Sequence, residues 1–322
     1  MFKKTLAAVA VSVFVFGAQA AEFTAADGTV FQVNLDAQAE VLNTKATVGS
    51  STTFNGAGQI QLKATRKVND DLSAFGQIEL NFDSVVDNAA ALSDDTKIGL
   101  SSKQFGSIQF GQYDSYMEDN IAEALGYTNP GVADVKVSEA SIGGRGRQAQ
   151  YMAKFGDFTG VVSVSSSNSG SATGEQSLGN SFVLGYQSGP LRAYIGTNTV
   201  PLYVSDTFAA GKVKFNLGAS IYYNFGSTTL SALTLDSTST TNLITSHTGF
   251  AVSHVMGNFD MAAAYQTKSV ASSATSSTTT NEYTLHGGYT VTKGTKFYVG
   301  LLGTGAKDGV GDMLAAGFST SF

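Results

Sequence analysis

The sequence predicts a transmembrane, antiparallel, up-and-down β-barrel of about sixteen strands, with its third long loop folded into the lumen. Three observations predict this fold. Apolar and polar residues alternate over long runs, short turns alternate with long polar connections, and no stretch is apolar for long enough to be a membrane helix. Strands that cross a bilayer need about 9–11 residues, whereas strands of soluble proteins average about 5–6. The length of the alternating runs therefore favours a membrane barrel over a soluble sandwich.

The first residues have the pattern of a secretory signal peptide. Lys3 and Lys4 precede a mostly apolar run, and Ala18-Gln19-Ala20 provides a small-residue cleavage site. A membrane anchor is the alternative, but the run is shorter than the roughly 20 residues that span a bilayer. We therefore expect residues 1–20 to be removed and residues 21–322 to form the barrel.

The composition excludes several classes of function. The chain has no Cys, so thiolate chemistry and disulfides cannot contribute. Its formal net charge is −6, and loss of two lysines with residues 1–20 would make it −8. An acidic chain without a basic cluster is not expected to bind nucleic acid.

Alternation with a period of two begins near the start of the expected barrel. In Phe31–Val41 the odd positions are apolar and the even positions are polar, and Leu72–Asp83 and Val213–Phe225 follow the same rule. Successive side chains of a strand point to opposite faces, so one face is apolar and the other is hydrated. Sixteen segments of this kind are expected, and some, such as Thr228–Asp236, are individually weak. They begin near Phe31, Phe54, Leu72, Asp95, Ser107, Gln148, Phe158, Asn180, Leu191, Lys212, Thr228, Ser246, Phe259, Asn281, Lys296 and Asp312.

The connections between these segments alternate in length. Short turns such as Gly156-Asp157, Gly189-Pro190 and Gly226-Ser227 are followed by long polar stretches, including the Ser/Thr-rich Ala271–Thr280. Short turns at one end and long loops at the other are typical of outer-membrane barrels. In lipid, a sheet must close because every backbone N–H and C=O needs a partner. A barrel of sixteen strands also leaves room for an aqueous channel.

The longest connection, Tyr116–Arg147, is the candidate functional segment. Connections longer than about 12–15 residues are uncommon and are usually functional or disordered. It contains apolar residues such as Ile121 and Leu125 that should pack against another surface. A solvated surface excursion is the alternative to a loop folded into the barrel. The loop is acidic until two arginines at its end, and its charged residues are Glu118, Asp119, Glu123, Asp134, Lys136, Glu139, Arg145 and Arg147.

No catalytic or metal site is predicted. His247 and His254 differ by an odd number of positions, so on one strand they face opposite sides and cannot share a metal. His286 lies on another strand, and no serine stands beside a histidine in a defined motif. Gly143–Arg147 lacks the context and ending of a phosphate-binding loop. No cofactor and no enzymatic activity are expected.

Several stretches resemble the general, trimeric diffusion porins of Gram-negative outer membranes. The resemblance implies a water-filled channel in the outer membrane for ions and small hydrophilic solutes. It also implies a homotrimer, contact with outer-membrane lipid and lipopolysaccharide, and a terminal phenylalanine read by the barrel-assembly machinery. The similar stretches are Ala21-Glu22-Phe23 with Asp27-Gly28, Val68–Gln77, Lys97–Leu100, Phe105–Gly111, Leu125–Thr128 and Phe322.

In that family the third loop holds carboxylates opposite basic residues on the barrel wall. By this resemblance, Lys97 is a wall residue that faces the acidic loop, and Arg145 and Arg147 oppose the loop where it rejoins the wall. Both arginines are out of phase with the inward parity of Gln148 unless the register breaks near Gly143-Gly144. The expected constriction residues are Lys97, Glu118, Asp119, Glu123, Asp134, Glu139, Arg145 and Arg147, and the expected lumen-lining residues are Asp36, Gln59, Lys63 and Glu79.

The sequence departs from the family pattern in its basic residues. Asp36 and Gln59 stand where many members have a lysine and an arginine, and the Pro-Glu-Phe-Gly-Gly tract of the loop is absent. Rings of charged side chains set ion selectivity, so weak to moderate cation selectivity is predicted.

Two alternatives stay open. One is a substrate-selective porin for sugars or oligosaccharides, for which Phe75, Tyr194, Tyr222 and Tyr298 have inward parity but are scattered in the sequence. The other is a structural or adhesive outer-membrane barrel whose lumen is plugged.

Overall fold

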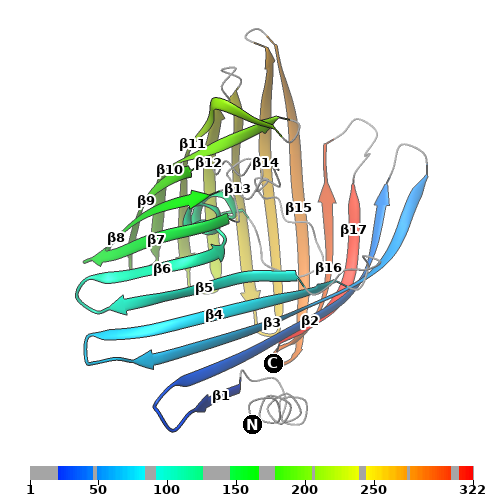
Figure 1. Cartoon of the computed structure of the whole chain (residues 1–322). Coiled ribbons are helices and arrows are strands. Elements are labelled where there is room, and N and C mark those ends of the chain that lie inside the picture. The colour runs from blue at the N-terminus through cyan, green and yellow to red at the C-terminus, as the bar shows by residue number, and fades with distance from the viewer. Residues whose placement is uncertain are drawn as a thin grey trace.

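The computed structural model confirms the predicted fold class. It describes residues 21–45, 49–83, 92–125, 146–166, 178–204, 207–238, 244–273, 276–305 and 312–321. These residues form a closed antiparallel barrel of sixteen strands, with one further short strand at the N-terminal end (Figure 1). The strands are β1 (Ala21–Thr24), β2 (Val30–Lys45), β3 (Ser50–Lys67), β4 (Leu72–Asp83), β5 (Leu92–Ser102), β6 (Gly106–Tyr113), β7 (Gly146–Phe155), β8 (Phe158–Ser166), β9 (Leu178–Ser188), β10 (Leu191–Val204), β11 (Thr207–Phe225), β12 (Thr228–Thr238), β13 (Ile244–Met256), β14 (Phe259–Ser273), β15 (Ser276–Thr292), β16 (Thr295–Gly303) and β17 (Met313–Ser321).

The barrel closes through β2. Each strand from β2 to β16 pairs with the next strand along the chain, and β17 pairs with β2. Asp36 on β2 is opposite Ser321 of β17, while Val33, three residues earlier, is already opposite Ala21 of β1. The strands β1 and β17 therefore share one position beside β2. Closure leaves no open sheet edge whose backbone groups would lack partners in lipid.

Side chains alternate between the two faces as the sequence predicts. On β11, Leu217 and Ile221 are each 48% exposed on the outer surface, whereas Asn216 and Ser220 point inward and are buried. On β5, Ile98 is exposed on the outer surface and its neighbour Lys97 points inward. An outward apolar face and a polar interior are the arrangement expected of a membrane barrel.

Short turns join the strands at one end of the barrel. Gly156 and Gly226 both have φ of 62°, in the left-handed region that glycine adopts without steric cost. Each begins a two-residue hairpin turn, for which a positive φ is required.

The described residues contain no helix that is both long and apolar enough to cross a membrane.

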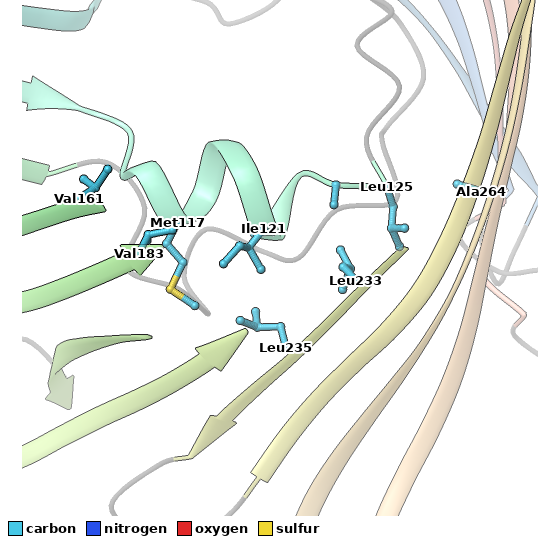
Figure 2. Packing of buried hydrophobic residues seen from close by; sticks show 10 residues of the cluster. Met117, Ile121, Leu125, Val161, Val183, Leu233, Leu235 and Ala264 are labelled. Atoms are coloured by element: carbon cyan, nitrogen blue, oxygen red, sulfur yellow. The ribbon is translucent and has the colours of Figure 1, made fainter. Parts of the chain in front are cut away.

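The buried hydrophobic cluster lies inside the barrel, between the wall and the segment that follows β6 (Figure 2). That segment includes the helical element η1 (Glu118–Ala122), which Figure 1 shows within the ring of strands. The cluster consists of Met117, Ile121, Ala122, Ala124, Leu125, Val161, Val183, Leu233, Leu235 and Ala264.

Candidate functional site

The first part of the long connection folds into the lumen as a helical segment. Glu123 donates its backbone N–H to the carbonyl of Glu118 at 3.0 Å, which is the i→i+5 spacing of a π-helix. Met117, Ile121 and Leu125 recur every four residues, so they lie on one face of the segment. All three are buried, and Figure 2 shows them directed toward the wall strands. The expectation that the loop packs inside the barrel is therefore confirmed for the described part of the loop.

The wall opposite this helical face is apolar and has little side-chain bulk. Glycines stand at the inward positions of β10, β11 and β13 that lie under the helical segment. A Cβ at Gly218 would lie 2.8 Å from Cγ2 of Ile121, and a Cβ at Gly249 would overlap Cδ1 of Leu125. Glycine is therefore required for the loop to approach this closely. Inward Leu235 on β12 completes the contact.

Hydrogen bonds fix the same segment to the wall. The carbonyl of Asn120 accepts hydrogen bonds from Ser220 Oγ at 2.5 Å and from Tyr222 Oη at 3.0 Å. At the start of the connection, Gln148 Nε2 donates to the carbonyl of Tyr113 at 2.7 Å. Strands β7 and β11 therefore hold the segment at two points in addition to its apolar face.

The opposite face of the helical segment is acidic. Asp119 is exposed toward the lumen and Glu123 is partly exposed one turn further along. The surrounding wall removes part of the water from the Asp119 carboxyl, and the negative charges of Glu123 and Asp95 act in the same direction. Together these effects raise the pKa of Asp119 to about 6, although the ammonium of Lys97 opposes the shift.

Lys97 reaches the lumen from β5, but a carboxylate already pairs with its charge. Its Nζ lies 3.3 Å from Oδ2 of Asp95 and 5.4 Å from the centre of the Tyr113 ring. The two charged side chains are only partly exposed, so their charges offset each other where solvent screening is weak. The residue predicted to oppose the acidic loop thus supplies little net positive charge.

The four predicted lumen-lining residues all occupy inward positions. Asp36 is opposite Gln59 on the neighbouring strand, and Lys63 shares the parity of Gln59. Gln59 and Gln61 donate to the two carboxylate oxygens of Glu79, at 2.5 and 2.9 Å. These side chains form a hydrogen-bonded polar surface on β2, β3 and β4.

Two constriction residues lie elsewhere than expected. Glu118 is 3% exposed and belongs to the buried face of the helical segment, because it precedes buried Ala122 by one turn. Arg147 is opposite Gln112 of β6 in a register that continues without a break, so it takes the outward parity of Tyr151. Within the described part of β7 no register break separates Arg147 from inward-facing Gln148. Asp134, Glu139 and Arg145 lie outside the described residues.

Some charged residues of the lumen were not predicted. Arg192 on β10 stacks its guanidinium on the Tyr222 ring, with Cζ 4.8 Å from the ring centre. Arg192 precedes Tyr194 by two positions, and residues two apart on a strand share one face. This spacing indicates that Arg192 faces the lumen if Tyr194 does. Asp95 has the same separation from Lys97, so the sequence also indicates that these two residues share one face.

A second charged cluster lies on β14, β15 and β16. Asp260 Oδ2 is 2.7 Å from Lys296 Nζ and 3.2 Å from His286 Nε2. The other two histidines lie on opposite faces of β13, since His247 is buried inside and His254 shares the outward parity of Phe250. The described residues contain no group of three or more acidic or histidine side chains arranged to hold a metal ion.

Comparisons with known proteins agree with this architecture. A family model described as Gram-negative porin matches residues 5–308. OmpF of Salmonella typhi, solved with daunomycin, superposes with a TM-score of 0.77 at 14% identity, over 94% of this chain and 100% of that chain. An anion-selective porin of Comamonas acidovorans gives 0.72 at 15% identity, over 91% and 100%. A loop-deletion mutant of OmpT, an outer membrane protein of Vibrio cholerae, gives 0.73 at 12% identity, over 92% and 100%. No curated protein matches the sequence.

Proposed function

We propose that this chain, which belongs to the family of Gram-negative porins, forms a water-filled channel with a weak preference for cations. Ions and small hydrophilic solutes diffuse through it down their concentration gradients. The observation that carries the proposal is a closed sixteen-stranded barrel with a polar inner wall and an acidic segment packed inside it. The family and the fold point to an outer-membrane channel rather than an enzyme.

The preference for cations follows from the charges of the described lumen. Asp119 and Glu123 carry negative charge on the face of the helical segment that is not packed against the wall. Asp95 offsets Lys97, and Arg147 lies on the outer face. Among the described residues, Arg192 lies over Tyr222, which is itself bonded to the segment, and supplies a positive charge there. A narrow passage through a low-dielectric wall strengthens the effect of each charge, so the net negative sign should favour cations.

The charges of these residues, and not the structural neighbours, determine the proposed selectivity. The Comamonas acidovorans porin is described as anion-selective, but it shares only 15% of its residues with this chain. At that identity the likeness supports the barrel and not the sign of the charge inside it.

The proposal includes export and assembly. Residues 1–20 act as a signal peptide that is removed, and residues 21–322 form the barrel in the outer membrane. Phe322 is read by the barrel-assembly machinery, and the outward apolar face contacts outer-membrane lipid and lipopolysaccharide. Three copies associate as a homotrimer, an arrangement that the trimer form of the Vibrio cholerae OmpT structure shows for that protein.

The test is the reversal potential of the refolded protein in a planar lipid bilayer under a KCl gradient. A potential of the sign that reports K⁺ over Cl⁻ supports the proposal. The double variant Asp119→Asn, Glu123→Gln should reduce this preference. Lys154→Gln is the control, because it changes one charge near the turn-side end of β7 and not on the inward segment. A reversal potential favouring chloride contradicts the selectivity, and folded protein without conductance would indicate a plugged structural barrel.

A further inference from the structure

Three tyrosines that are far apart in the sequence meet inside the barrel. Tyr116 of the inward segment, Tyr194 of β10 and Tyr222 of β11 form one continuous aromatic cluster. The ring centres of Tyr116 and Tyr194 are 6.3 Å apart, and those of Tyr194 and Tyr222 are 6.1 Å apart, both in edge-to-face geometry. All three residues remain partly exposed, so part of this aromatic surface is available to the lumen. Of the three tyrosines predicted to face inward, Tyr194 and Tyr222 are therefore brought together. The third, Tyr298, lies apart from them, beside His286.

The wall is shaped to receive the central ring of this cluster. A Cβ at Gly185 on β9 would lie 2.9 Å from Cε1 of Tyr194, closer than such atoms approach each other. The Tyr194 ring therefore lies against the backbone of the neighbouring strand. Within the described residues the Tyr194 hydroxyl makes no hydrogen bond, whereas the Tyr222 hydroxyl anchors Asn120. Tyr194 contributes an aromatic surface without being a polar anchor of the loop.

Arg192 adds hydrogen-bond donors beside the rings. Its guanidinium lies over the Tyr222 ring, and its Nε is buried without a hydrogen-bond acceptor among the described residues. Across the described part of the chain, no carboxylate or carbonyl is hydrogen bonded to this guanidinium. A guanidinium presents five donors in a fixed plane, and stacking on an aromatic ring leaves those in-plane donors free for another molecule.

A carboxylate also acts on the same cluster. Glu123 and Arg192 both act electrostatically on Tyr222, so a carboxylate and a guanidinium are both close to the aromatic cluster. An anionic solute would be repelled by Asp119 and Glu123, and a cationic solute would be repelled by Arg192. A neutral ring with several hydroxyl groups avoids both penalties, because its hydroxyls accept from the guanidinium and donate to the carboxylate.

We propose that Tyr116, Tyr194, Tyr222 and Arg192 form a binding subsite for a neutral saccharide that passes through the channel. The C–H face of a sugar ring stacks on the exposed aromatic surface, as apolar faces do on aromatic side chains in ligand sites. The hydroxyl groups at the ring edge bond to Arg192 and Glu123. This inference rests on the proposed channel function and gives it a substrate class.

The experiment is sugar-induced block of the ion current through single channels, with maltotriose as the probe. The wild-type channel should show brief blocks whose frequency rises with maltotriose concentration. Tyr194→Leu keeps an apolar side chain but removes the ring, and it should weaken maltotriose binding about tenfold, the scale of one aromatic contact. Tyr194→Phe should bind maltotriose as the wild type does. Phe75→Leu is the matched control. Phe75 on β4 also points inward, where it lies against Gly99 of the neighbouring strand, and it is on the opposite side of the barrel from the tyrosine cluster.

The possible outcomes distinguish failure of the saccharide subsite from failure of the proposed channel function. If folded protein conducts no current, the channel function fails and the subsite fails with it. If the channel conducts but maltotriose causes no block, the subsite alone is overturned. Equal weakening by Tyr194→Leu and Phe75→Leu would also overturn it, because the block would then not depend on the cluster. The conductance of each variant in sugar-free salt shows that the barrel and loop are intact.

Discussion

Replacing Met117, Ile121 and Leu125 together by alanine should release the inward segment from the wall and raise the single-channel conductance. The three side chains are at most 1% exposed. Burial of an aliphatic side chain of this size is worth about 1.5–3 kcal/mol, so the three together hold the segment with about 5–9 kcal/mol. Each truncation in a packed site costs about 2–5 kcal/mol. The triple substitution therefore removes an amount comparable with the whole apolar attachment.

A milder change at the same place provides the control. Ile121→Val removes one methyl group and costs about 0.5–1.5 kcal/mol, roughly a factor of ten in the docking equilibrium at most. The segment should then stay docked, and the conductance should equal that of the wild type. The assay is stepwise insertion into planar bilayers at fixed KCl concentration. Heat-modifiable migration on gels confirms that each barrel is folded.

The result that would refute this reasoning is a folded triple variant with wild-type conductance. The hydrogen bonds from Ser220 and Tyr222 to the Asn120 carbonyl are worth about 0.5–1.5 kcal/mol each. They are too weak to hold the segment alone against its conformational entropy. An unchanged conductance would mean that the segment does not narrow the passage.

Three further predictions concern charge and orientation. Asp95→Asn removes the carboxylate 3.3 Å from Lys97 Nζ, so the lumen gains a positive charge and the K⁺/Cl⁻ permeability ratio should fall. The pKa of Asp119 is about 6, so its negative charge is present above that pH and lost below it. The preference for cations should therefore rise as the pH is raised from about 5 to about 7. The variant Asp119→Asn should abolish this rise. Phe250→Lys on the lipid face should cost about 2–4 kcal/mol and reduce the folded fraction on gels, whereas Gln38→Lys on the lumen face should not.

The ends of the strands show what the sequence could and could not predict. The seven strands that follow the predicted short turns begin within one residue of the predicted positions, as at Leu72 and Phe259. Glycines with positive φ, such as Gly156 and Gly257, mark those turns. Strands that follow long loops, except β17, begin earlier than predicted, and β11 begins at Thr207 where Lys212 was expected. Beyond the bilayer both faces of a strand meet water, so the alternation that marks its membrane part is absent.

The weak segment at β12 has a structural explanation. Its inward positions hold buried Leu233 and Leu235 where a hydrated lumen would require polar residues. Those leucines contact the inward segment instead of water, so the polar positions that would complete an alternating pattern are missing from this strand. The four-residue spacing of Met117, Ile121 and Leu125 and the inward Gly218 were the matching indications of this contact in the sequence.

The placement of the basic residues could not be settled by resemblance. Arg147 depended on a register break that pairing with β6 does not contain. Arg192 belongs to no shared motif, and its position beside the helical segment depends on two distant parts of the chain meeting. Long-range juxtaposition of this kind has no local pattern in the sequence.

The central claim is a hydrated interior with a lipid-facing exterior, and neighbouring residues on β4 test it most directly. The chain has no native Cys, so one introduced thiol reports from one place. In bilayers, a charged, water-soluble thiol reagent should react with Glu79→Cys and change the channel current, and it should leave Ile78→Cys unreacted. Reaction of Ile78→Cys with protection of Glu79→Cys would contradict the account.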